Sequence, residues 1–487
     1  MRIAHLASEV VPFSKTGGLA DVAGALPAAQ AALGHDVTVI VPGHRTSLAE
    51  TLPGRVCFEV KALGLAATVM EVEQGSARVL LLDCPPLYVR PALYTLPEGD
   101  FPDNAVRFVF FVRAALAALA RTGGCDIVNA HDWQAALAPV LLAHDPATRA
   151  TLASTHTVLT IHNLAYQGTF APWVLEPCDL PRTWFTTELL EFYGQVNLLK
   201  AGLATADAIT TVSPTYAREI LTPAFGCGLE GVLDGRSSII TGILNGLDTT
   251  EWDPAHDVNL TTPYDARGVA AGKRAARADL AQKHSVAASE RPLLGMVSRL
   301  AEQKGADVVF AALDDLLALG FDLVVLGTGE RRYEDALRGA AAAHPRRVYT
   351  FARFDERLAH QIYAASDFFL MPSRYEPCGL GQMISMRYGS LPIVHSTGGL
   401  VDTVTDVAEP DGTGIVFAPL TPTAFTAALA RARATFDDAR RLAQARTAAM
   451  ARDFSWQASA QRYLALYQTI RERRAPREDT RGLEEKA

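Results

Sequence analysis

The chain has 487 residues, which corresponds to about three domains of average size or to two large ones, and so excludes a single small module. Hydrophobic residues make up 49% of the chain and charged residues 20%, a balance that excludes global disorder because it provides enough apolar side chains for large cores. Lysine and arginine number 45 against 53 aspartate and glutamate residues, so the net charge is −8. This charge offers no attraction for a nucleic-acid backbone or an anionic membrane, and we expect neither as a partner.

The six cysteines are scattered, with no C-x-x-C pair and no cysteine and histidine array at zinc spacing. The first residues include Glu9 and contain no apolar stretch of signal-peptide length, and no window is apolar enough to span a membrane. These features predict a soluble, cytoplasmic protein with reduced thiols and no structural metal.

Short runs of valine, isoleucine and leucine alternate with longer helical patterns, which is typical of parallel sheets covered by helices on both faces. The first block predicts strands at 2–7, 36–41, 79–83, 126–130, 158–162 and 208–212. Helices are expected at 19–33, 105–121 and 134–143. The block has the size of a nucleotide-binding fold.

A second block follows a segment from Asn245 to Arg267, whose Asp, Thr, Gly and Pro residues are typical of a linker. Its strands are expected at 293–298, 323–326, 348–351, 368–371 and 391–394, with helices that begin near Gly305, Arg332, Leu358 and Cys378. The fold class is therefore α/β, with two doubly wound parallel-sheet domains. We place them at 1–245 and 246–455, followed by a helix at 456–474 that packs back on the first domain and a disordered tail at 475–487.

One short segment occurs once in each block. Thr16–Asp21 has the sequence TGGLAD and Thr397–Asp402 has TGGLVD, so five of the six positions match. Both copies precede an apolar helix, where glycines let backbone amides approach a ligand and the helix N-terminus favours negative charge. The pattern predicts two anion-binding helix starts that face each other across a cleft. The structural alternative is a common turn that only leads into a helix.

Basic residues follow the first strand of each block. Lys15 stands beside the first glycine pair, and Arg299 and Lys304 follow the strand at 293–298. Doubly wound sheets bind ligands at the carboxyl ends of their strands, and an arginine with a lysine can hold a diphosphate and stabilise it as it leaves. The structural alternatives are a solvated lysine and a surface ion pair with Glu302.

Other polar residues lie at further strand ends. Glu376 precedes the turn CGLG, His131 and Asp132 follow the strand at 126–130, and His162 and Asn163 follow the strand at 158–162. A buried acid needs a polar partner, and His, Asp and Asn suit a ligand rich in hydroxyl groups. Alternatively, Glu376 favours the positive end of the next helix, and either histidine is a core residue bonded to a backbone carbonyl.

Three common motifs do not occur: G-x-G-x-x-G after a strand, G-x-x-x-x-G-K-[ST], and H-E-x-x-H. A dinucleotide oxidoreductase, a P-loop NTPase and a zinc protease all lose support. An anion site together with side chains that suit hydroxyl groups indicates a sugar nucleotide as the ligand.

The motifs KTGGLADVAGALP, NAHDWQA, IHNLAYQG, ILNGLD, VSRLAEQKG, PSRYEPCGLGQM and TGGLVDTV resemble those of the bacterial glycogen synthase family, and the resemblance extends from the first strand to DFSWQ. It implies the GT-B fold, in which two Rossmann-like domains close on ADP-glucose. It also implies a retaining glucosyltransferase that extends an α-1,4-glucan (glycogen or a maltooligosaccharide) at the non-reducing end and needs no metal ion or other cofactor. The first domain would be the acceptor side and the second the donor side.

The resemblance also implies roles for individual residues. Lys15 is matched to a donor contact, Arg299 and Lys304 to the pair that neutralises the diphosphate, Glu376 to an acid that the family does not tolerate losing, and His162 to a position near the sugar. The catalytic residues would thus be Glu376, His162, Arg299 and Lys304. The substrate-binding residues would be Lys15, Gly17, Gly18, Asp21, Tyr94, Asp132, Asn163, Asn245, Cys378, Gly379, Leu380, Thr397, Gly398 and Gly399.

Some positions depart from the family pattern. Gly381 stands where a threonine or asparagine often follows GL, and Phe354 where a tyrosine is expected, so the nucleoside contacts are expected to differ in detail. Two alternatives stay open: an α-glucosyltransferase of the same fold that uses UDP-glucose, and a glucan-binding protein without catalysis. Retention of both basic residues and of Glu376 argues against the second.

Overall fold

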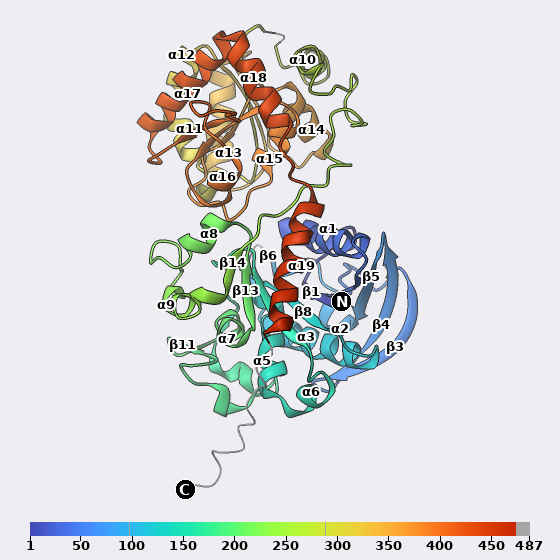
Figure 1. Ribbon diagram of the computed structural model, residues 1–487. Coiled ribbons are helices and arrows are strands. Elements are labelled where there is room, and N and C mark those ends of the chain that lie inside the picture. Colours follow the sequence, from blue (N-terminus) through green and yellow to red (C-terminus); the bar gives the residue numbers. More distant parts are fainter. Residues whose placement is uncertain (97, 288, 474–487) are drawn as a thin grey trace. The chain divides into compact units, whose positions relative to one another are not determined.

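The computed structural model describes residues 1–96, 98–287 and 289–473, and the chain forms two compact units (Figure 1). Unit 1 contains Met1–Thr211, Ile220–Ile243 and the described residues from Gln457 onward. Unit 2 contains Val212–Glu219 and Leu244–Trp456. The tail expected at 475–487 lies outside the described residues.

Unit 1 is built on a nine-stranded sheet in the order β14-β13-β9-β8-β1-β2-β5-β4-β3. Its parallel strands are β1 (Arg2–Leu6), β2 (Asp36–Pro42), β5 (Ala77–Asp83), β8 (Ile127–His131), β9 (His156–Ile161), β13 (Ala208–Thr211) and β14 (Ile240–Gly242). The six strands expected in the first block are all confirmed. They are buried because helices cover both faces, as their continuous apolar runs predict.

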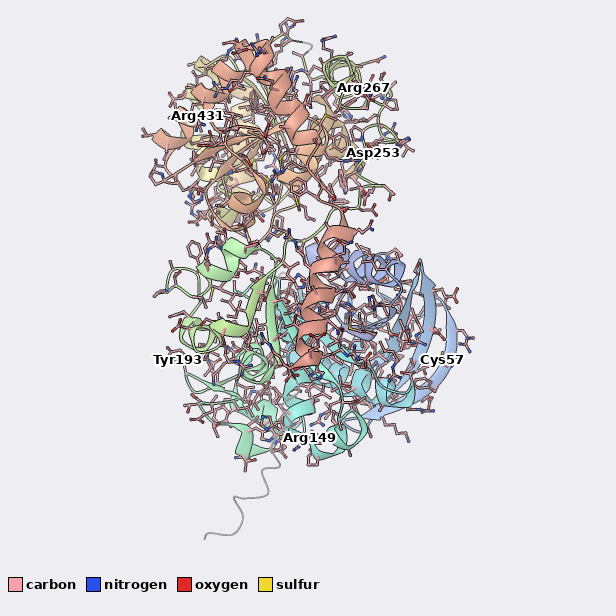
Figure 2. All side chains as sticks on the ribbon, viewed as in Figure 1. Cys57, Arg149, Tyr193, Asp253, Arg267 and Arg431 are labelled. Atoms are coloured by element: carbon pink, nitrogen blue, oxygen red, sulfur yellow. The ribbon has the colours of Figure 1, made fainter. Side chains whose placement is uncertain are left out.

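The antiparallel strands β3 (Arg55–Ala62) and β4 (Leu65–Gln74) at one edge of this sheet were not predicted. Their two-residue turn, Leu63 and Gly64, has positive φ at both positions, 47° and 73°. A hairpin turn of this kind is usually recognised by Asn-Gly or Asp-Gly, and a leucine hides it. β3 is half exposed, and Cys57 marks it in Figure 2.

Helices and short elements complete unit 1. The helices are α1 (Gly18–Ala32), α2 (Pro85–Tyr88), α3 (Asn104–Arg121), α4 (Asp132–Ala135), α5 (Leu137–His144), α6 (Pro146–Thr151), α7 (Leu198–Thr205) and α9 (Glu230–Asp234). The short strands are β6 (Thr95–Leu96), β7 (Gly99–Asp100), β10 (Thr169–Phe170), β11 (Glu191–Phe192) and β12 (Gln195–Asn197). The 3₁₀ turns are Pro172–Leu175, Arg182–Trp184 and Ser237–Ile239.

The single helix expected at 134–143 is wrong, because the segment forms the two helices α4 and α5. Pro139 has no N–H to donate to the carbonyl of Ala135, so the hydrogen-bond ladder is interrupted at that point. The short α4 therefore ends at Ala135, close to the strand end that carries Asp132.

Unit 2 contains six parallel strands in the order β17-β16-β15-β18-β19-β20. They are β15 (Leu293–Val297), β16 (Asp322–Leu326), β17 (Val348–Phe351), β18 (Phe368–Met371), β19 (Leu391–His395) and β20 (Ile415–Phe417). Numbered within the unit, this is the Rossmann order 3-2-1-4-5-6. Five of the six strands were expected, and the prediction of two Rossmann-like parallel sheets is confirmed.

The helices of unit 2 are α8 (Pro214–Glu219), α10 (Val269–His284), α11 (Ala306–Ala311), α12 (Leu313–Ala318), α13 (Arg331–Ala343), α14 (Glu356–Ala365), α15 (Gly381–Arg387), α16 (Gly398–Thr403), α17 (Pro422–Asp437) and α18 (Ala439–Met450), with a 3₁₀ turn at Glu302–Lys304. The helix expected to begin near Cys378 begins later, at Gly381, because Gly379 adopts a left-handed conformation with φ of 73°.

Helix α19 (Trp456–Glu472) returns the chain to unit 1 from Gln457 onward, where its red ribbon is labelled in Figure 1. Tyr463 and Tyr467 on this helix are fully buried, and Asn129 Nδ2 donates a hydrogen bond of 2.8 Å to the Tyr467 hydroxyl. Among the helices of the described part of the chain, none has the length and apolar character that crossing a bilayer requires.

Candidate functional site

The large sheet of each unit has one point where the strand order changes direction. Most of the predicted site residues follow the strands beside this point. In unit 1 this point lies between β1 and β8, and in unit 2 between β15 and β18. Loops at such a point diverge and leave room for a ligand at the carboxyl ends of the strands. Lys15 and Asp132 follow the first pair of strands, and Lys304 and Glu376 follow the second.

In unit 2 the structure joins two of the predicted catalytic residues directly. Lys304 Nζ lies 2.6 Å from Glu376 Oε2 and 2.9 Å from Oε1. Ser373 Oγ donates a further hydrogen bond of 2.8 Å to Glu376 Oε2. Glu376 is only 6% exposed, so Lys304 and Ser373 supply the polar partners that a buried carboxylate requires.

The loops that carry this pair are pressed together. A Cβ atom on Gly305 would lie 1.9 Å from the carbonyl oxygen of Pro372, and Gly305 has a left-handed φ of 70°. Close by, Arg374 forms a two-pronged ion pair with Asp307, at 2.8 and 2.7 Å. The close approach of Gly305 to Pro372 fixes the distance between the β15 and β18 loops, and with it the positions of Lys304 and Glu376.

Arg299 differs from Lys304, because its side chain is exposed. Its guanidinium donates a hydrogen bond of 3.2 Å to Gln303 Oε1. A neutral amide partner leaves the positive charge of Arg299 uncompensated at that contact. An exposed guanidinium after the first strand of a Rossmann sheet is suited to a phosphate group.

The EPCGL segment packs directly on the second copy of the TGG motif. Cβ atoms on Gly398 and Gly399 would lie 2.0 Å from the carbonyl oxygen of Glu376 and 2.2 Å from that of Cys378. The Gly399 amide donates to the Glu376 carbonyl at 3.0 Å. Both glycines therefore serve close packing in this structure, besides any role toward a ligand.

The remaining predicted residues of unit 2 surround this segment. Burial raises the pKa of the Cys378 thiol to about 12, which makes it a packing residue and not a nucleophile at neutral pH. A hydrogen bond from the Asn245 backbone reaches the same thiol, and Asn245 is 8% exposed. Gly379 accepts from Gln382, and Leu380 caps α15.

In unit 1, Asp132 connects the ends of β8 and β9. Its Oδ1 accepts a hydrogen bond of 2.7 Å from the His162 amide, and the Asn163 backbone also bonds to the carboxylate. Asp132 has a left-handed φ of 54°, an unfavourable conformation for a residue with a side chain. Burial raises the pKa of Asp132 to about 7 in spite of these hydrogen bonds. A strained, buried carboxylate at a strand end is typical of a functional site.

Two other predicted residues of unit 1 have different partners. Lys15 Nζ forms an exposed ion pair of 2.7 Å with Asp21 Oδ1. The Tyr94 hydroxyl shares a hydrogen bond of 2.7 Å with Ser8 Oγ, and its ring packs against Phe108. Burial raises the pKa of Tyr94 well above its usual value, so the phenol stays neutral.

Both TGG turns bind a carboxylate that the sequence analysis missed. In unit 1, Glu9 Oε2 accepts from the Thr16 amide at 2.5 Å and from the Thr16 hydroxyl at 2.8 Å. In unit 2, Glu219 Oε1 accepts from the Thr397 hydroxyl at 3.1 Å and from the Gly398 amide at 3.0 Å. The repeated motif marks the turns, but Glu219 is 178 residues away from Thr397 and no local pattern connects them.

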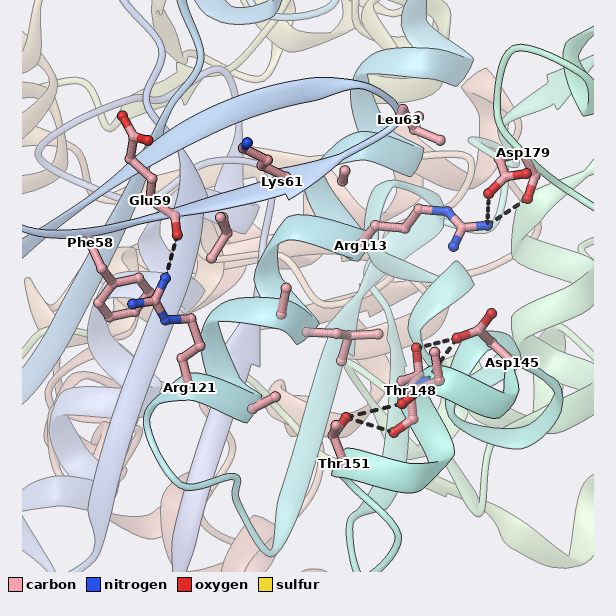
Figure 3. A pocket seen from close by; sticks show the side chains of 16 residues that line it. Phe58, Glu59, Lys61, Leu63, Arg113, Arg121, Asp145, Thr148, Thr151 and Asp179 are labelled. Carbon is pink, nitrogen blue, oxygen red and sulfur yellow. Dashed lines mark hydrogen bonds and ion pairs between the residues drawn. The ribbon is translucent and has the colours of Figure 1, made fainter.

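A groove elsewhere on unit 1 contains none of the predicted site residues (Figure 3). It has a volume of about 970 Å³ and is lined by β3, α3 and α6. Two of its three cationic side chains have protein partners: Arg121 donates to the Glu59 carbonyl and covers the Phe58 ring, and Arg113 donates to the Asp179 carbonyl. The size of a hollow therefore does not identify the site here.

Comparisons with known proteins agree with this arrangement. The family model "Starch synthase catalytic domain" matches residues 2–235, and the model "Glycosyl transferases group 1" matches residues 291–434. The chain is 48% identical to a glycogen synthase of Anaeromyxobacter dehalogenans, over 96% of this chain and 100% of that protein. It is 45% identical to glycogen synthase 2 of Geobacter sulfurreducens, over 96% and 98% of the two chains.

Solved structures give the same result. The catalytic domain of starch synthase IV from Arabidopsis thaliana, bound to ADP and acarbose, is 33% identical with a TM-score of 0.88, over 97% of this chain and 99% of that one. A sucrose-phosphate synthase from Thermosynechococcus elongatus, 20% identical with a TM-score of 0.61, shares the fold over 96% and 98% of the two chains. The predicted GT-B fold is confirmed, and the chain belongs to the glycogen synthase and starch synthase family of glucosyltransferases.

Proposed function

We propose that this glucosyltransferase moves glucose from ADP-glucose to the non-reducing end of an α-1,4-glucan, with retention at the anomeric carbon and release of ADP. The observation that carries the proposal is the ion pair of the partly buried Lys304 with the buried Glu376, in the same loop region as the exposed Arg299, at the strand-order reversal of unit 2. The starch synthase relative that holds ADP and acarbose supports both the nucleotide and the glucan class.

The leaving group determines which residues are needed. When the bond between the anomeric carbon and the phosphate oxygen breaks, the electron pair stays on the diphosphate, and Arg299 and Lys304 stabilise the added charge. The acceptor oxygen bonds to the anomeric carbon on the same face, and its proton passes to the departing phosphate oxygen. Glu376 holds Lys304 in place through the contacts of 2.6 and 2.9 Å. A covalent glucosyl-enzyme trapped with a slow donor would contradict this route.

The decisive experiment measures nucleotide release and glucose incorporation together. Purified enzyme receives ADP-glucose or UDP-glucose, with and without glycogen. We expect ADP release that requires glycogen and equals the glucose incorporated. A preference for UDP-glucose would overturn the donor assignment, and nucleotide release without incorporation would overturn the acceptor.

We also propose that the reaction needs no metal ion, since two cationic side chains are available to neutralise the diphosphate. Within the described ranges, Glu251, Glu356 and His360 have the spacing of metal ligands, so the point needs a direct test. Enzyme treated with EDTA and then assayed in metal-free buffer should keep its full rate. A loss that added Mg²⁺, Mn²⁺ or Zn²⁺ restores would contradict the proposal.

The site of action that we propose is the cytoplasm. All six cysteines are free thiols, four of them buried. Reduced thiols persist in a reducing compartment, whereas an oxidising one favours disulfides.

A further inference from the structure

A row of three histidines and one glutamine runs through the interior of unit 1 and ends at His162. His5 lies on β1, His131 ends β8, and both are fully buried. Gln30 Oε1 on α1 lies 2.8 Å from His5 Nε2. His131 Nε2 lies 3.0 Å from His5 Nδ1, and His131 Nδ1 lies 2.9 Å from His162 Nε2.

All three rings are neutral at physiological pH. Burial lowers the pKa of His5 to about 4 and that of His162 to about 3, and it lowers the pKa of His131 well below the usual value. The carboxylate of Asp132 bonds to the His162 amide and not to its ring. A neutral imidazole has one N–H donor and one acceptor nitrogen. A ring that donates on one side must therefore accept on the other, so the direction of one hydrogen bond determines the direction of the next.

The glutamine sets that direction. Its Oε1 can only accept, so the proton of His5 is on Nε2 and its Nδ1 accepts from His131 Nε2–H. His131 Nδ1 then accepts from His162 Nε2–H. By the same rule His162 keeps Nδ1 as a bare acceptor. One amide oxygen, three hydrogen bonds away, thus selects the tautomer of a ring that is itself only partly buried.

We propose that Gln30, His5 and His131 are positioning residues that hold His162 in the tautomer with its proton on Nε2 and its Nδ1 free to accept a hydrogen bond from a sugar hydroxyl. The role near the sugar rests on the proposed function. The tautomer itself rests only on the hydrogen-bond row. A fixed tautomer removes the need to reorganise the ring when the substrate binds, which is how preorganised polar groups contribute to rate.

Two substitutions at Gln30 separate positioning from simple packing. Gln30→Met keeps the length of the side chain but removes the acceptor, whereas Gln30→Glu keeps an acceptor and adds a buried charge. If Gln30 only filled space, the apolar variant would be the better tolerated. If it directs the row, Gln30→Glu should keep the kcat of glucose transfer above that of Gln30→Met, even though its melting temperature is the lower of the two.

The chain offers a matched control in unit 2. Gln361 Oε1 lies 2.9 Å from His284 Nε2, and Gln361 is 4% exposed. Gln361→Met therefore removes the same kind of bond in the unit that does not contain the histidine row. It should leave both the kcat and the His162 tautomer unchanged.

The direct readout is ¹⁵N NMR of imidazole-labelled enzyme, with the His162 signals assigned by their loss in His162→Asn. We expect a single Nε2–H tautomer in the unsubstituted enzyme and in Gln30→Glu, and a mixture in Gln30→Met. In Gln30→Met the kcat should fall by about threefold to tenfold with little change in the donor KM, because only part of the molecules is competent. A single Nδ1–H tautomer in the unsubstituted enzyme, or identical spectra in all variants, would overturn the proposal.

The spectrum requires no turnover. If the enzyme made no glucan, the proposed function would fail while the tautomer could still be tested. If glucan synthesis were normal and the tautomer unaffected by Gln30→Met, the positioning role alone would fail.

Discussion

Lys304 and Glu376 illustrate how much the local environment decides at the scale of single residues. Lys304 is a cation beside a buried carboxylate whose other hydrogen bond comes from Ser373. The two charges compensate each other before any ligand binds. Under the proposed function, a phosphate that approaches Lys304 would share the cation with Glu376.

Neutralising Glu376 should therefore affect the reaction more than the fold. We expect Glu376→Gln to lower kcat by roughly 10² to 10³, because Lys304, which stabilises the charge of the leaving diphosphate, loses the carboxylate that holds it in place. The hydrogen bond from Ser373 can remain, so the melting temperature should change little. Coupled measurement of kcat and thermal unfolding tests this.

Asp307→Asn is the matched control, because it breaks the neighbouring ion pair between Asp307 of α11 and Arg374 of the β18 loop. Its kcat should stay within about twofold of the unsubstituted enzyme, since surface pairs contribute little. Equal losses in both variants would show that loop position, and not Glu376 itself, is what matters.

The raised pKa of Asp132 predicts that the stability of the protein depends on pH. Burial raises its pKa in the folded protein to about 7, from 3.8 in an unfolded chain. Between these values the folded protein holds a proton that the unfolded chain has released. The contribution of Asp132 to the free energy of unfolding therefore falls as the pH rises from about 4 to about 7, by on the order of 4 kcal/mol.

Asp132→Asn should remove this contribution. The difference in melting temperature between the variant and the unsubstituted protein should grow in favour of the variant as the pH rises through that window, and stay constant above it. Melting curves at half-unit pH steps provide the measurement. Two parallel profiles would mean that Asp132 titrates near its ordinary pKa.

At the scale of elements, the fold follows closely from the sequence where apolar runs are continuous. The parallel strands of both units are such runs, and the strand ends of β1, β8, β9, β15 and β18 could be located to within a residue or two. The predictions that were wrong depend on particular residues. The β3–β4 hairpin was missed because Leu63 stands in a turn that usually takes Asn or Asp. The helix at 134–143 is divided near Pro139, and α15 begins after Gly379.

The candidate site could be predicted in part for the same reason. Residues at strand ends are visible in the sequence because they interrupt an apolar run, as His162 does. Glu9, Gln30 and Glu219 were missed, since each acts through a partner brought near by the fold. His5 lies inside a buried strand, where a histidine is ordinarily a core residue, and only its contacts with Gln30 and His131 show otherwise.

Gly305 provides the test at this scale. It combines φ of 70° with a Cβ position 1.9 Å from the Pro372 carbonyl, so Gly305→Ala must both strain the backbone and push the β18 loop away. We expect a loss of at least about 2 kcal/mol in stability together with a reduced kcat. Chemical unfolding and kinetics on the same sample measure both.

Gly339→Ala is the opposite case. Gly339 lies inside α13, and its Cβ position meets nothing within 4 Å. Because alanine favours helix, this variant should gain about 0.5 to 1 kcal/mol with kcat unchanged. A loss of stability in Gly339→Ala as well as in Gly305→Ala would contradict the expectation that the Cβ contact and the positive φ of Gly305 cause its loss.

At the scale of the whole molecule, the chain passes between the two units at 211–212, 219–220, 243–244 and 456–457. Each unit has its own buried core, and α19 gives Tyr467 to the core of unit 1 from the far end of the sequence. The stability of the sheet that contains β1 and β8 therefore depends on α19, a helix several hundred residues later in the sequence.

Tyr467→Ala should destabilise unit 1 selectively, by about 3 to 5 kcal/mol, because it opens a cavity and leaves Asn129 Nδ2 without the hydroxyl to which it donates. Phe425→Ala, at a fully buried position of α17, should do the same to unit 2. Hydrogen exchange followed by peptide should show faster exchange in β1 and β8 for the first variant, and in β19 and β20 for the second. Uniform acceleration in both units would contradict separate cores.

The repeated TGG turn has a consequence for selectivity. Glu9 and Glu219 are covalently part of the chain, so each turn already faces a carboxylate at a local concentration that free ions in solution do not reach. Simple anions such as sulfate, acetate or orthophosphate should therefore compete poorly with this intramolecular carboxylate. We expect that only a ligand that binds through several groups at once displaces it, so an anion site at these turns would exclude small free anions.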